Sequence, residues 1–398
     1  MSYTADVFKA VFDRTPTHMV RSPGRVNLIG EHIDYAGLPV LPMAIDKDIT
    51  IAFAPRQDNI VRVVNDNPLF SSKEFEVSSE IPHQDLGDWG NYLQAAAQGL
   101  SREFGISRGV DAAISSTLPI ASGLSSSASL VIAIGLALLQ ANDISVDAIA
   151  LAEILARAER YVGTQGGGMD QAIVLGAKPG SASYIHFNPL RLSATAVPTD
   201  WRFIVASSLV RAEKSGAAKD AYNERVRQTG EALQAVLRAL DSESPGGGYP
   251  DLVARYRTQE LVEVAEQNLS DTLFRRFMHV ITEADRVASA SEAMKEGDIE
   301  TFGDLMSASH LSLKNDFEVS SDELDSLVAH AEEGGAVGAR LTGAGFGGCI
   351  VALCEASATE EMLTYLSKTF YAQRDVTGPL DDLLFLANPT GGASVTAI

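Results

Sequence analysis

The sequence is poor in cysteine and in positive charge, and both shortages narrow what the protein can be. Its 398 residues include two cysteines, Cys349 and Cys354, which lie five positions apart in one strand-like segment. This spacing offers neither a disulfide framework nor a cysteine metal site, so we expect two free thiols in a reducing compartment. Lysine and arginine number 31 against 52 aspartates and glutamates, giving a formal net charge of −21. So acidic a chain is a poor partner for the phosphate backbone of nucleic acid, and we expect none to bind.

Long apolar runs and common nucleotide-binding motifs are also missing. No uncharged apolar run reaches the ~18 residues of a membrane span, and Asp6 interrupts the start of the chain before any leader-like segment. We therefore expect a soluble, cytoplasmic protein with no membrane partner. The motif Gly-x4-Gly-Lys-Ser/Thr does not occur. Residues 343–348 fit Gly-x-Gly-x-x-Gly, but the strand-like run Cys349–Leu353 follows where a dinucleotide site needs a helix.

A serine-rich segment that contains Gly123, residues 118–129, joins a strand-like run to an apolar helix expected at Leu130–Leu139. A helix N-terminus presents unpaired N–H groups and the positive end of the helix dipole, so this segment could bind phosphate through backbone and hydroxyl donors. One serine is enough to cap a helix, and a capped core helix is the alternative interpretation. The segment alone leaves both open.

Polar residues with versatile chemistry gather at the end of an early strand. The apolar run Val26–Ile29 is bounded by Arg25 and followed by Glu31, His32 and Asp34, all within ten positions. Strand ends and the loops after them are where scaffolds place functional side chains. Carboxylates with an imidazole suit the hydroxyls of a sugar, because carboxylates accept hydrogen bonds and histidine donates or accepts them. An acidic surface turn is the alternative for any single one of these residues.

Two neighbouring segments in the middle of the chain carry further acidic residues. We expect Ser145 to cap a helix that ends near Tyr161, which puts Glu159 in its last turn, the unfavourable end for an acid. A metal ion is one candidate partner, and a solvated surface glutamate is the alternative. Three glycines at 166–168 then precede Asp170 and allow close backbone approach, although a flexible loop also explains them.

Trp89 begins a helix expected to run to Phe104, where it is either a core residue or a flat surface for a purine ring. The pattern of expected elements changes near residue 200, where a strand followed by several helices begins. At this length two lobes are expected, because single cores stop growing at ~250–300 residues. We place the lobes at 1–200 and 201–398. The second lobe is predicted to hold a strand at 203–207 and helices near 217–240, 251–268, 271–296, 300–315 and 321–333.

Three motifs in this order resemble those of the GHMP small-molecule kinases: Arg25–Tyr35, Gly123–Ala128 and Leu341–Gly348. The first is the most specific and is similar to the signature of galactokinases, N-acetylgalactosamine kinases and plant arabinose kinases. The resemblance extends over nearly the whole chain, including Ser309–Leu313 and 321–325. It implies a two-lobed α/β (α+β) kinase, with an N-terminal ribosomal-protein-S5-like lobe, a C-terminal GHMP lobe and the active site in the cleft between them.

The resemblance also implies a role for individual residues. Asp170 would face the C1 hydroxyl of the sugar, with Arg25 beside it. The other sugar contacts would be Glu31, His32, Asp34, Gly168 and Tyr222. The ATP contacts would be Trp89, Gly123, Leu124, Ser125, Ser126 and Ser127. Ser127 and Glu159 would ligate Mg²⁺.

The resemblance leaves the identity of the sugar open. Tyr161–Gln171 and Asn65–Phe70 are more similar to N-acetylgalactosamine kinases, whereas Tyr222 matches galactokinases, and galactose is our first choice. A catalytically silent galactose and ATP sensor is an alternative of another class, but such proteins lose a Ser-Ala pair that this chain keeps at Ser127–Ala128. A more distant kinase acting on mevalonate, homoserine or a heptose is a further alternative, disfavoured by the Glu31–Tyr35 cluster. The sequence does not indicate the oligomeric state.

Overall fold

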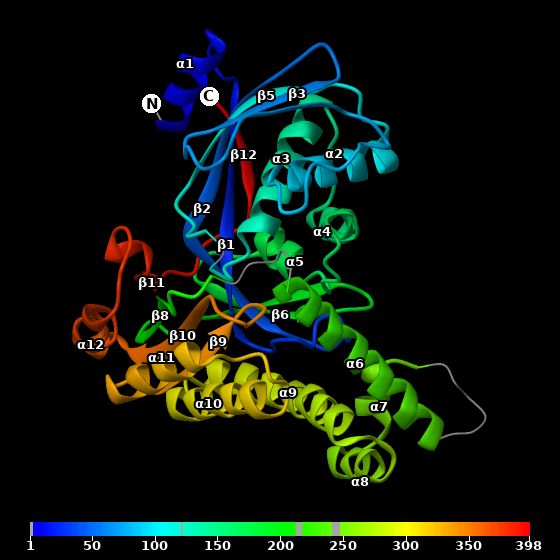
Figure 1. Ribbon diagram of the computed structural model, residues 1–398, viewed down its shortest axis with the longest axis vertical. Coiled ribbons are helices and arrows are strands. Elements are labelled where there is room, and N and C mark those ends of the chain that lie inside the picture. The colour runs from blue at the N-terminus through cyan, green and yellow to red at the C-terminus, as the bar shows by residue number, and fades with distance from the viewer. Residues whose placement is uncertain (1–2, 121, 212–216, 241–246) are drawn as a thin grey trace.

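The computed structural model of the chain describes residues 3–120, 122–211, 217–240 and 247–398. Two large sheets with helices packed on them lie one above the other (Figure 1), and the described residues also form a third, antiparallel sheet of two strands, 181–186 and 191–196. The elements of the first half are α1 (Tyr3–Phe12), β1 (His18–Ile29), β2 (Leu41–Pro55), β3 (Ile60–Asn65), β4 (Lys73–Glu76), α2 (Gly90–Phe104), β5 (Val110–Ser116), α3 (Ser126–Ala141), α4 (Ala148–Glu159), α5 (Met169–Gly176), β6 (Ser181–His186) and β7 (Arg191–Ala196). Those of the second half are β8 (Trp201–Ser207), α6 (Ala217–Leu240), α7 (Tyr249–Arg255), α8 (Thr258–Asn268), α9 (Asp271–Glu296), α10 (Ile299–Asn315), α11 (Asp322–Glu333), β9 (Gly338–Thr342), β10 (Cys349–Glu355), α12 (Thr359–Thr369), β11 (Leu384–Ala387) and β12 (Ser394–Ala397).

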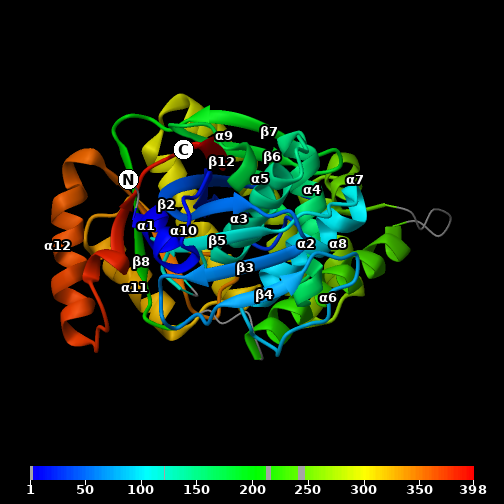
Figure 2. The same cartoon turned by 90° about the horizontal axis from the view of Figure 1, so that it is seen from above.

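The upper sheet has six strands in the order β12-β1-β2-β5-β3-β4, which lie side by side in Figure 2. All neighbours are antiparallel except β3 and β5, which run parallel. The apolar helix α3 packs on β1 and β2 and is covered in turn by α2 and α4. Because α3 is enclosed on all sides, its apolar residues need no polar stripe, which explains the continuous apolar run in the sequence.

The lower sheet is antiparallel, with the strand order β11-β8-β10-β9. Helices α9 and α10 pack together beneath it, and α10 contacts β9 (Figure 1). The glycine-rich turn 343–348 joins β9 to β10, so a strand follows the glycines as expected and no dinucleotide-binding helix is formed. This turn faces the upper sheet, because the Asn27 backbone N–H on β1 donates to Thr342 Oγ1 on β9 at 3.0 Å.

The chain returns to the upper sheet at its end. In β12 the residues from Ser394 to Ala397 pair with Arg21 to His18 of β1, and the two chain ends lie close together in Figure 1. The lower sheet starts at Trp201, near the expected change at residue 200. The division into lobes at 1–200 and 201–398 stays a prediction, and strand pairing assigns 394–397 to the upper sheet.

Most expected elements of the second half occur, with α6 and α9 at the predicted positions, but two details are wrong, one in each half of the chain. The helix expected at 251–268 is two helices, because Tyr256 is extended and Glu260 accepts a hydrogen bond from the Arg257 N–H at 3.0 Å, which starts a new helix. The helix after residue 145 is capped by Asp147, whose carboxylate accepts from two backbone N–H groups of its first turn.

Two other expectations concern cysteine and membranes. Cys349 and Cys354 are both free and buried in β10, as the spacing predicted. Within the described ranges, the helices are too short or too polar to cross a bilayer. The cytoplasmic location stays a prediction.

Candidate active site

Two adjoining hollows lie between the sheets. The first, with a cavity volume of about 90 Å³, we call the acidic pocket. Its charged or titratable lining residues are Arg25, Glu31, His32, Asp34, Glu159, Asp170, Lys219 and Tyr222. The second, with a cavity volume of about 600 Å³, we call the serine pocket, and it is lined by Trp89, Ser125, Ser126 and Ser127 among others. The hollows meet at Gly123, Lys219 and Ala344, which line both.

An ion pair between Arg25 and Asp170 forms the centre of the acidic pocket. Arg25 lies on β1 and Asp170 in the first turn of α5, so the pair joins segments 145 positions apart. The guanidinium Nε and one terminal nitrogen lie 2.8 and 2.7 Å from the same Asp170 oxygen. The other terminal nitrogen donates to the Gly123 carbonyl at 2.6 Å. Arg25 therefore connects the acidic residue to the loop that borders both pockets.

The charge of Arg25 is secured by its surroundings. Burial disfavours the charged guanidinium, but the nearby carboxylates of Asp170 and Glu31 outweigh that effect, and the pKa of Arg25 is raised. The group therefore stays a cation, placed where negative charge is to be neutralised.

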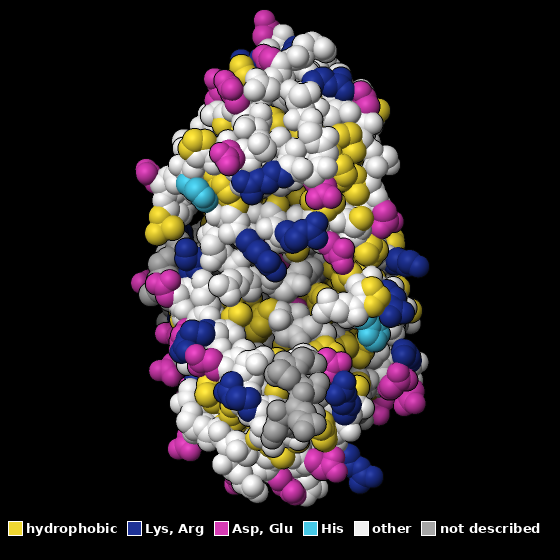
Figure 3. Space-filling view, turned by 90° about the vertical axis from the view of Figure 1, so that its right-hand side faces the viewer, with side chains coloured by type: hydrophobic (Ala, Val, Ile, Leu, Met, Phe, Trp, Pro, Cys, Tyr) yellow, Lys and Arg dark blue, Asp and Glu magenta, His cyan; other side chains and the backbone are white. Residues whose placement is uncertain are grey.

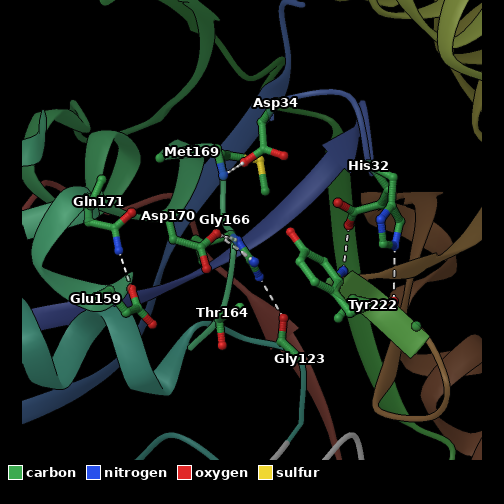
Figure 4. A pocket seen from close by; sticks show the side chains of 18 of the residues that line it. His32, Asp34, Gly123, Glu159, Thr164, Gly166, Met169, Asp170, Gln171 and Tyr222 are labelled. Atoms are coloured by element: carbon green, nitrogen blue, oxygen red, sulfur yellow. Dashed lines mark hydrogen bonds and ion pairs between the residues drawn. The ribbon is translucent and has the colours of Figure 1, made fainter. Parts of the chain in front are cut away.

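Asp34 and Asp170 line the acidic pocket together with the glycine loop 166–168, and Asp34 lies above Asp170 and Gly166 in the view of Figure 4. Burial, and secondly the charge of Asp170, raises the pKa of Asp34 from 3.8 to about 6. Its Oδ2 accepts from the Gly167 N–H at 3.1 Å. A β-carbon on Gly167 would lie 2.3 Å from the backbone of Asp34 and Tyr35, so only glycine permits this approach.

Glu31 holds the segment 25–35 against the glycine-rich turn 343–348 of the lower sheet. Its carboxylate accepts from the Asn27 amide at 2.8 Å and from the Gly343 N–H at 2.5 Å. Burial raises the pKa of Glu31, although the guanidinium groups of Arg340 and Arg25 oppose this. The carboxylate borders the acidic pocket, but its best bonds are made within the protein.

His32 is neutral and fixed in one tautomer. Burial lowers the pKa of His32 to about 3. Nε2 lies 3.0 Å from the Ala344 carbonyl and therefore carries the hydrogen, while Nδ1 accepts from the Tyr35 hydroxyl at 3.1 Å. His32 thus borders the pocket with both ring nitrogens engaged.

Residues on α9 hold the segment 25–35 in place, and none of them is predicted from the sequence. His279 Nε2 donates to the Glu31 carbonyl at 3.0 Å, and the Glu283 carboxylate accepts from the Gly30 N–H at 2.9 Å. Ser309 also donates to Glu283, at 2.6 Å. Burial alone would raise the pKa of Glu283, but the Arg286 guanidinium and other cations lower it to about 2, so this acid is charged in the core. The spacing of four between positions 279 and 283 puts both on one helix face, which is the signal available in the sequence.

Helix α6 supplies the remaining wall of the acidic pocket. The Tyr222 ring lies 5.4 Å from the His32 ring and 5.9 Å from the Tyr35 ring, and it points toward the space between His32 and Asp170 (Figure 4). Lys219, one turn earlier on α6, lines both pockets and was not among the predicted residues. Its distance of three positions from Tyr222 is the pattern that could have found it.

The serine pocket is built from the loop before α3 and an aromatic rim. Ser125 adopts a left-handed conformation with φ 60° and makes no side-chain cap. Its Oγ is buried and has no hydrogen-bond partner within the described residues. Leu124 lines neither pocket: its side chain is in the core, and its carbonyl accepts from the Arg25 N–H at 3.2 Å. Within the loop before α3, the polar groups that border the pocket therefore belong to the serines and the backbone of the helix start.

Aromatic side chains border the serine pocket at two places. Trp89 directly precedes α2, donates to the Ser71 carbonyl at 3.1 Å and packs edge-on against Phe70. His83 stacks on Tyr161 with ring centroids 3.8 Å apart, a pair the sequence analysis did not identify. Flat apolar surfaces of this kind suit a planar ring.

Glu159 is the last residue of α4 and so lies in the last turn of the helix, as predicted. In Figure 4 it lies on the far side of Asp170 from His32. The Gln171 amide donates to its carboxylate. Glu159 borders the acidic pocket whereas Ser127 borders the serine pocket. Within the described ranges, no group of three or more His, Cys, Asp or Glu residues is arranged to hold a metal by itself.

Comparison with known proteins identifies the family. The galactokinase galactose-binding signature matches residues 6–55, which include Arg25 and Asp34. The GHMP kinases N terminal domain matches 91–177, and the GHMP kinases C terminal domain matches 290–372. A galactokinase from Roseiflexus sp. (strain RS-1) is 36% identical over 370 residues, covering 91% of this chain and 89% of the relative. The chain belongs to the galactokinase family. It is therefore a GHMP kinase, a phosphotransferase that uses ATP as a substrate.

Solved structures agree with membership of the galactokinase family. The crystal structure of Lactococcus lactis galactokinase complexed with galactose matches with a TM-score of 0.83 and 29% identity, covering 98% of both chains. Methanococcus jannaschii mevalonate kinase matches with a TM-score of 0.62 and 22% identity, covering 95% of this chain and 100% of that one. The second likeness shows the fold alone. The predicted two-lobed α/β GHMP architecture is confirmed.

Proposed function

We propose that the chain transfers the γ-phosphoryl group of ATP to the C1 hydroxyl of galactose, giving galactose 1-phosphate and ADP. The observation that carries this proposal is the Arg25–Asp170 pair in the acidic pocket, linked through Gly123 to the serine pocket. Phosphoryl transfer is catalysed mainly by positioning and by neutralisation of charge, so a kinase needs an acceptor pocket next to a phosphate site. The galactose-bound relative supports galactose as the acceptor.

The sugar binds in the acidic pocket with its C1 hydroxyl at Asp170 and Arg25. Asp34, Glu31, His32, the Gly168 backbone and Tyr222 surround the other hydroxyls. Several polar groups converging on one hollow suit a ligand with a hydroxyl on almost every carbon. The ionised form of Asp34 accepts two hydroxyls, so a pKa of about 6 leaves it competent at neutral pH.

ATP binds in the serine pocket with its phosphates at the start of α3. Gly123 and Ser125 to Ser127 lie at that helix N-terminus, whose N–H groups and dipole favour an anion. The buried, unpartnered Oγ of Ser125 is a polar group that a phosphate oxygen would satisfy. Leu124 contributes backbone only. Trp89 offers a flat surface for adenine.

Magnesium fits this site as part of the nucleotide complex. The ion is commonly held by one or two carboxylates together with substrate phosphates, so the Ser127 hydroxyl and the Glu159 carboxylate are a sufficient protein contribution. A cation bound at the Glu159 carboxylate would also offset the unfavourable position of this acid at the C-terminal end of α4. When bound, Mg²⁺ would neutralise phosphate charge.

In the reaction, the C1 oxygen forms a bond to the γ-phosphorus while the bond from that phosphorus to the bridging oxygen of ADP breaks. Asp170 orients the hydroxyl and accepts its proton, and Arg25 stabilises the resulting negative charge. The Gly123 carbonyl holds Arg25 in this position.

The proposal is tested by a coupled ADP-release assay with Mg²⁺-ATP and galactose, N-acetylgalactosamine, arabinose, glucose or mevalonate as acceptor. We expect galactose to give the highest kcat/KM. The galactokinase relatives do not favour the N-acetylgalactosamine and sensor alternatives. Preference for N-acetylgalactosamine would correct the substrate. Absence of turnover with a melting temperature raised by galactose and ATP would favour the sensor.

A further inference from the structure

Lys219 lies where the two pockets meet. It is in the first turn of α6 and is the one cation, within the described residues, that lines both hollows. A β-carbon on Gly163 would lie 3.2 Å from Lys219 Nζ, so the ammonium group reaches across to the start of the glycine loop. The neighbouring Asn223 donates to the Gly163 carbonyl at 3.2 Å, which ties this part of α6 to the same loop.

The charges around this junction are unbalanced. Four carboxylates line the acidic pocket, namely Glu31, Asp34, Glu159 and Asp170. The cations lining it are Arg25 and Lys219. Arg25 already bonds to Asp170 and Gly123 through all of its side-chain nitrogens. A transferring phosphoryl group brings further negative charge toward these carboxylates, and it needs a cation that is not already committed.

Lys219 meets this requirement. No hydrogen bond or ion pair of its side chain is found within the described residues, in contrast to Lys73, whose Nζ is paired with Asp88 at 2.5 Å. Basic side chains also gather across the middle of the face that carries α2, α4 and α6 (Figure 3). An ammonium group is a compact charge on a flexible stem, so it can follow a moving phosphoryl group.

We propose that Lys219 is a further catalytic residue, whose ammonium group contacts the γ-phosphoryl oxygens as they pass from the serine pocket to the acidic pocket. The inference rests on the proposed kinase function. Lys219 keeps its protons throughout: the C1 oxygen gains the phosphoryl group, ADP leaves with the bond electrons, and Lys219 only stabilises the charge between them.

The test compares Lys219→Ala and Lys219→Arg with Lys178→Ala, which removes an equal charge from an exposed lysine that lines neither pocket. We expect Lys219→Ala to lower kcat roughly 10²-fold, the order of effect of one donor aimed at transition-state charge. The KM values for galactose and ATP and the melting temperature should stay near those of the wild type. Lys219→Arg keeps the charge and should retain more activity, and Lys178→Ala should behave as the wild type.

A binding measurement separates this role from simple nucleotide binding. ADP lacks the γ-phosphoryl group, so its Kd should not change in Lys219→Ala. ADP with aluminium fluoride and galactose, which imitates the transferring group, should bind roughly 10²-fold more weakly to this variant.

The outcomes distinguish the two proposals. An active wild type with unimpaired kcat in Lys219→Ala would overturn the inference alone. A raised KM for ATP with unchanged kcat would overturn it too, because Lys219 would then bind the ground state only. A wild type that phosphorylates none of the sugars would overturn the proposed function, and this inference with it.

Discussion

The acidic pocket and the serine pocket meet at Gly123, but they are built in different ways. In the acidic pocket, side chains from distant segments hold one another, as Arg25 holds Asp170 and Asn27 holds Glu31. The serine pocket is formed by a helix start and an aromatic rim, and the Ser125 hydroxyl lacks a partner within the described part of the chain. The acidic pocket is preorganised, and we expect its buried carboxylates to lower the stability of the ligand-free protein. The serine pocket instead leaves hydrogen-bond donors for its ligand to satisfy.

Asp170→Asn breaks the centre of the acidic pocket and should have the largest effect. The variant keeps the shape but loses the proton acceptor and the charge that faces Arg25. We expect kcat to fall roughly 10²–10⁴-fold, as for other positioned acids and bases. Steady-state ADP release measures this, with Asp304→Asn on the exposed surface of α10 as the control. Near-normal turnover would show that Asp170 is not needed for proton transfer.

Asp34→Asn tests whether the acidic pocket costs stability. Because the pKa of Asp34 is raised from 3.8 to about 6, its contribution to stability is present below pH 4 and is lost as the pH rises through 6. Removing the charge should therefore stabilise the ligand-free protein at pH 8 by up to about 3 kcal/mol, and by much less at pH 4.

Urea unfolding of wild type and Asp34→Asn at pH 4 and 8 measures this difference, and galactose binding should weaken in the same variant. Asp304→Asn should show no comparable pH dependence. A variant that is less stable than the wild type at pH 8 would mean that the hydrogen bonds to Asp34 outweigh the cost of burying its charge and its repulsion from Asp170.

Adjacent glycines offer a sharper test of the same pocket. Gly167→Ala places a methyl group 2.3 Å from the backbone of Asp34 and Tyr35, so the loop must move and the Gly167 N–H leaves Asp34. We expect a loss of about 1–3 kcal/mol in stability and a raised KM for galactose. Gly166→Ala is the matched control, because its β-carbon would meet no heavy atom within 4 Å among the described residues beyond its two chain neighbours. Thermal unfolding and kinetics of both variants decide, and equal effects would contradict this account.

The two pockets also differ in how far the sequence predicts them. The sequence predicts a group of polar residues at the end of β1, because they lie within ten positions of one another. They are Arg25, Glu31, His32 and Asp34. The contacts of His279 with Glu31 are not predicted, since they join residues 248 positions apart and local periodicity carries no pairing information. For the same reason the return of β12 to β1 is absent from the prediction.

The elements themselves follow local pattern. Helices α6 and α9 have a regular apolar period and were predicted at their observed bounds. The region 251–268 has the same period on both sides of Tyr256, so the break was hidden, and only Glu260 three positions after Arg257 signals a new helix start. The spacing of three places Lys219 on the same face of α6 as Tyr222, but it does not indicate that this face lines two pockets. The significance of Lys219 comes from lining both pockets.

Ser125→Ala tests the serine pocket and should have the smallest effect. If the buried Oγ of Ser125 waits for a phosphate oxygen, removing it should not lower the stability of the ligand-free protein. The KM for ATP should rise a few-fold, because the variant loses one hydrogen bond to ATP, which contributes about 0.5–1.5 kcal/mol. Ser129→Ala, one turn later on α3, is the matched opposite, because Ser129 Oγ already donates to the Pro23 carbonyl at 2.6 Å. That variant should lower the melting temperature and leave the KM for ATP unchanged. If Ser125→Ala lowered stability as Ser129→Ala does, both hydroxyls would be structural. The two pockets would then no longer differ in whether their polar groups bond within the protein or wait for a ligand.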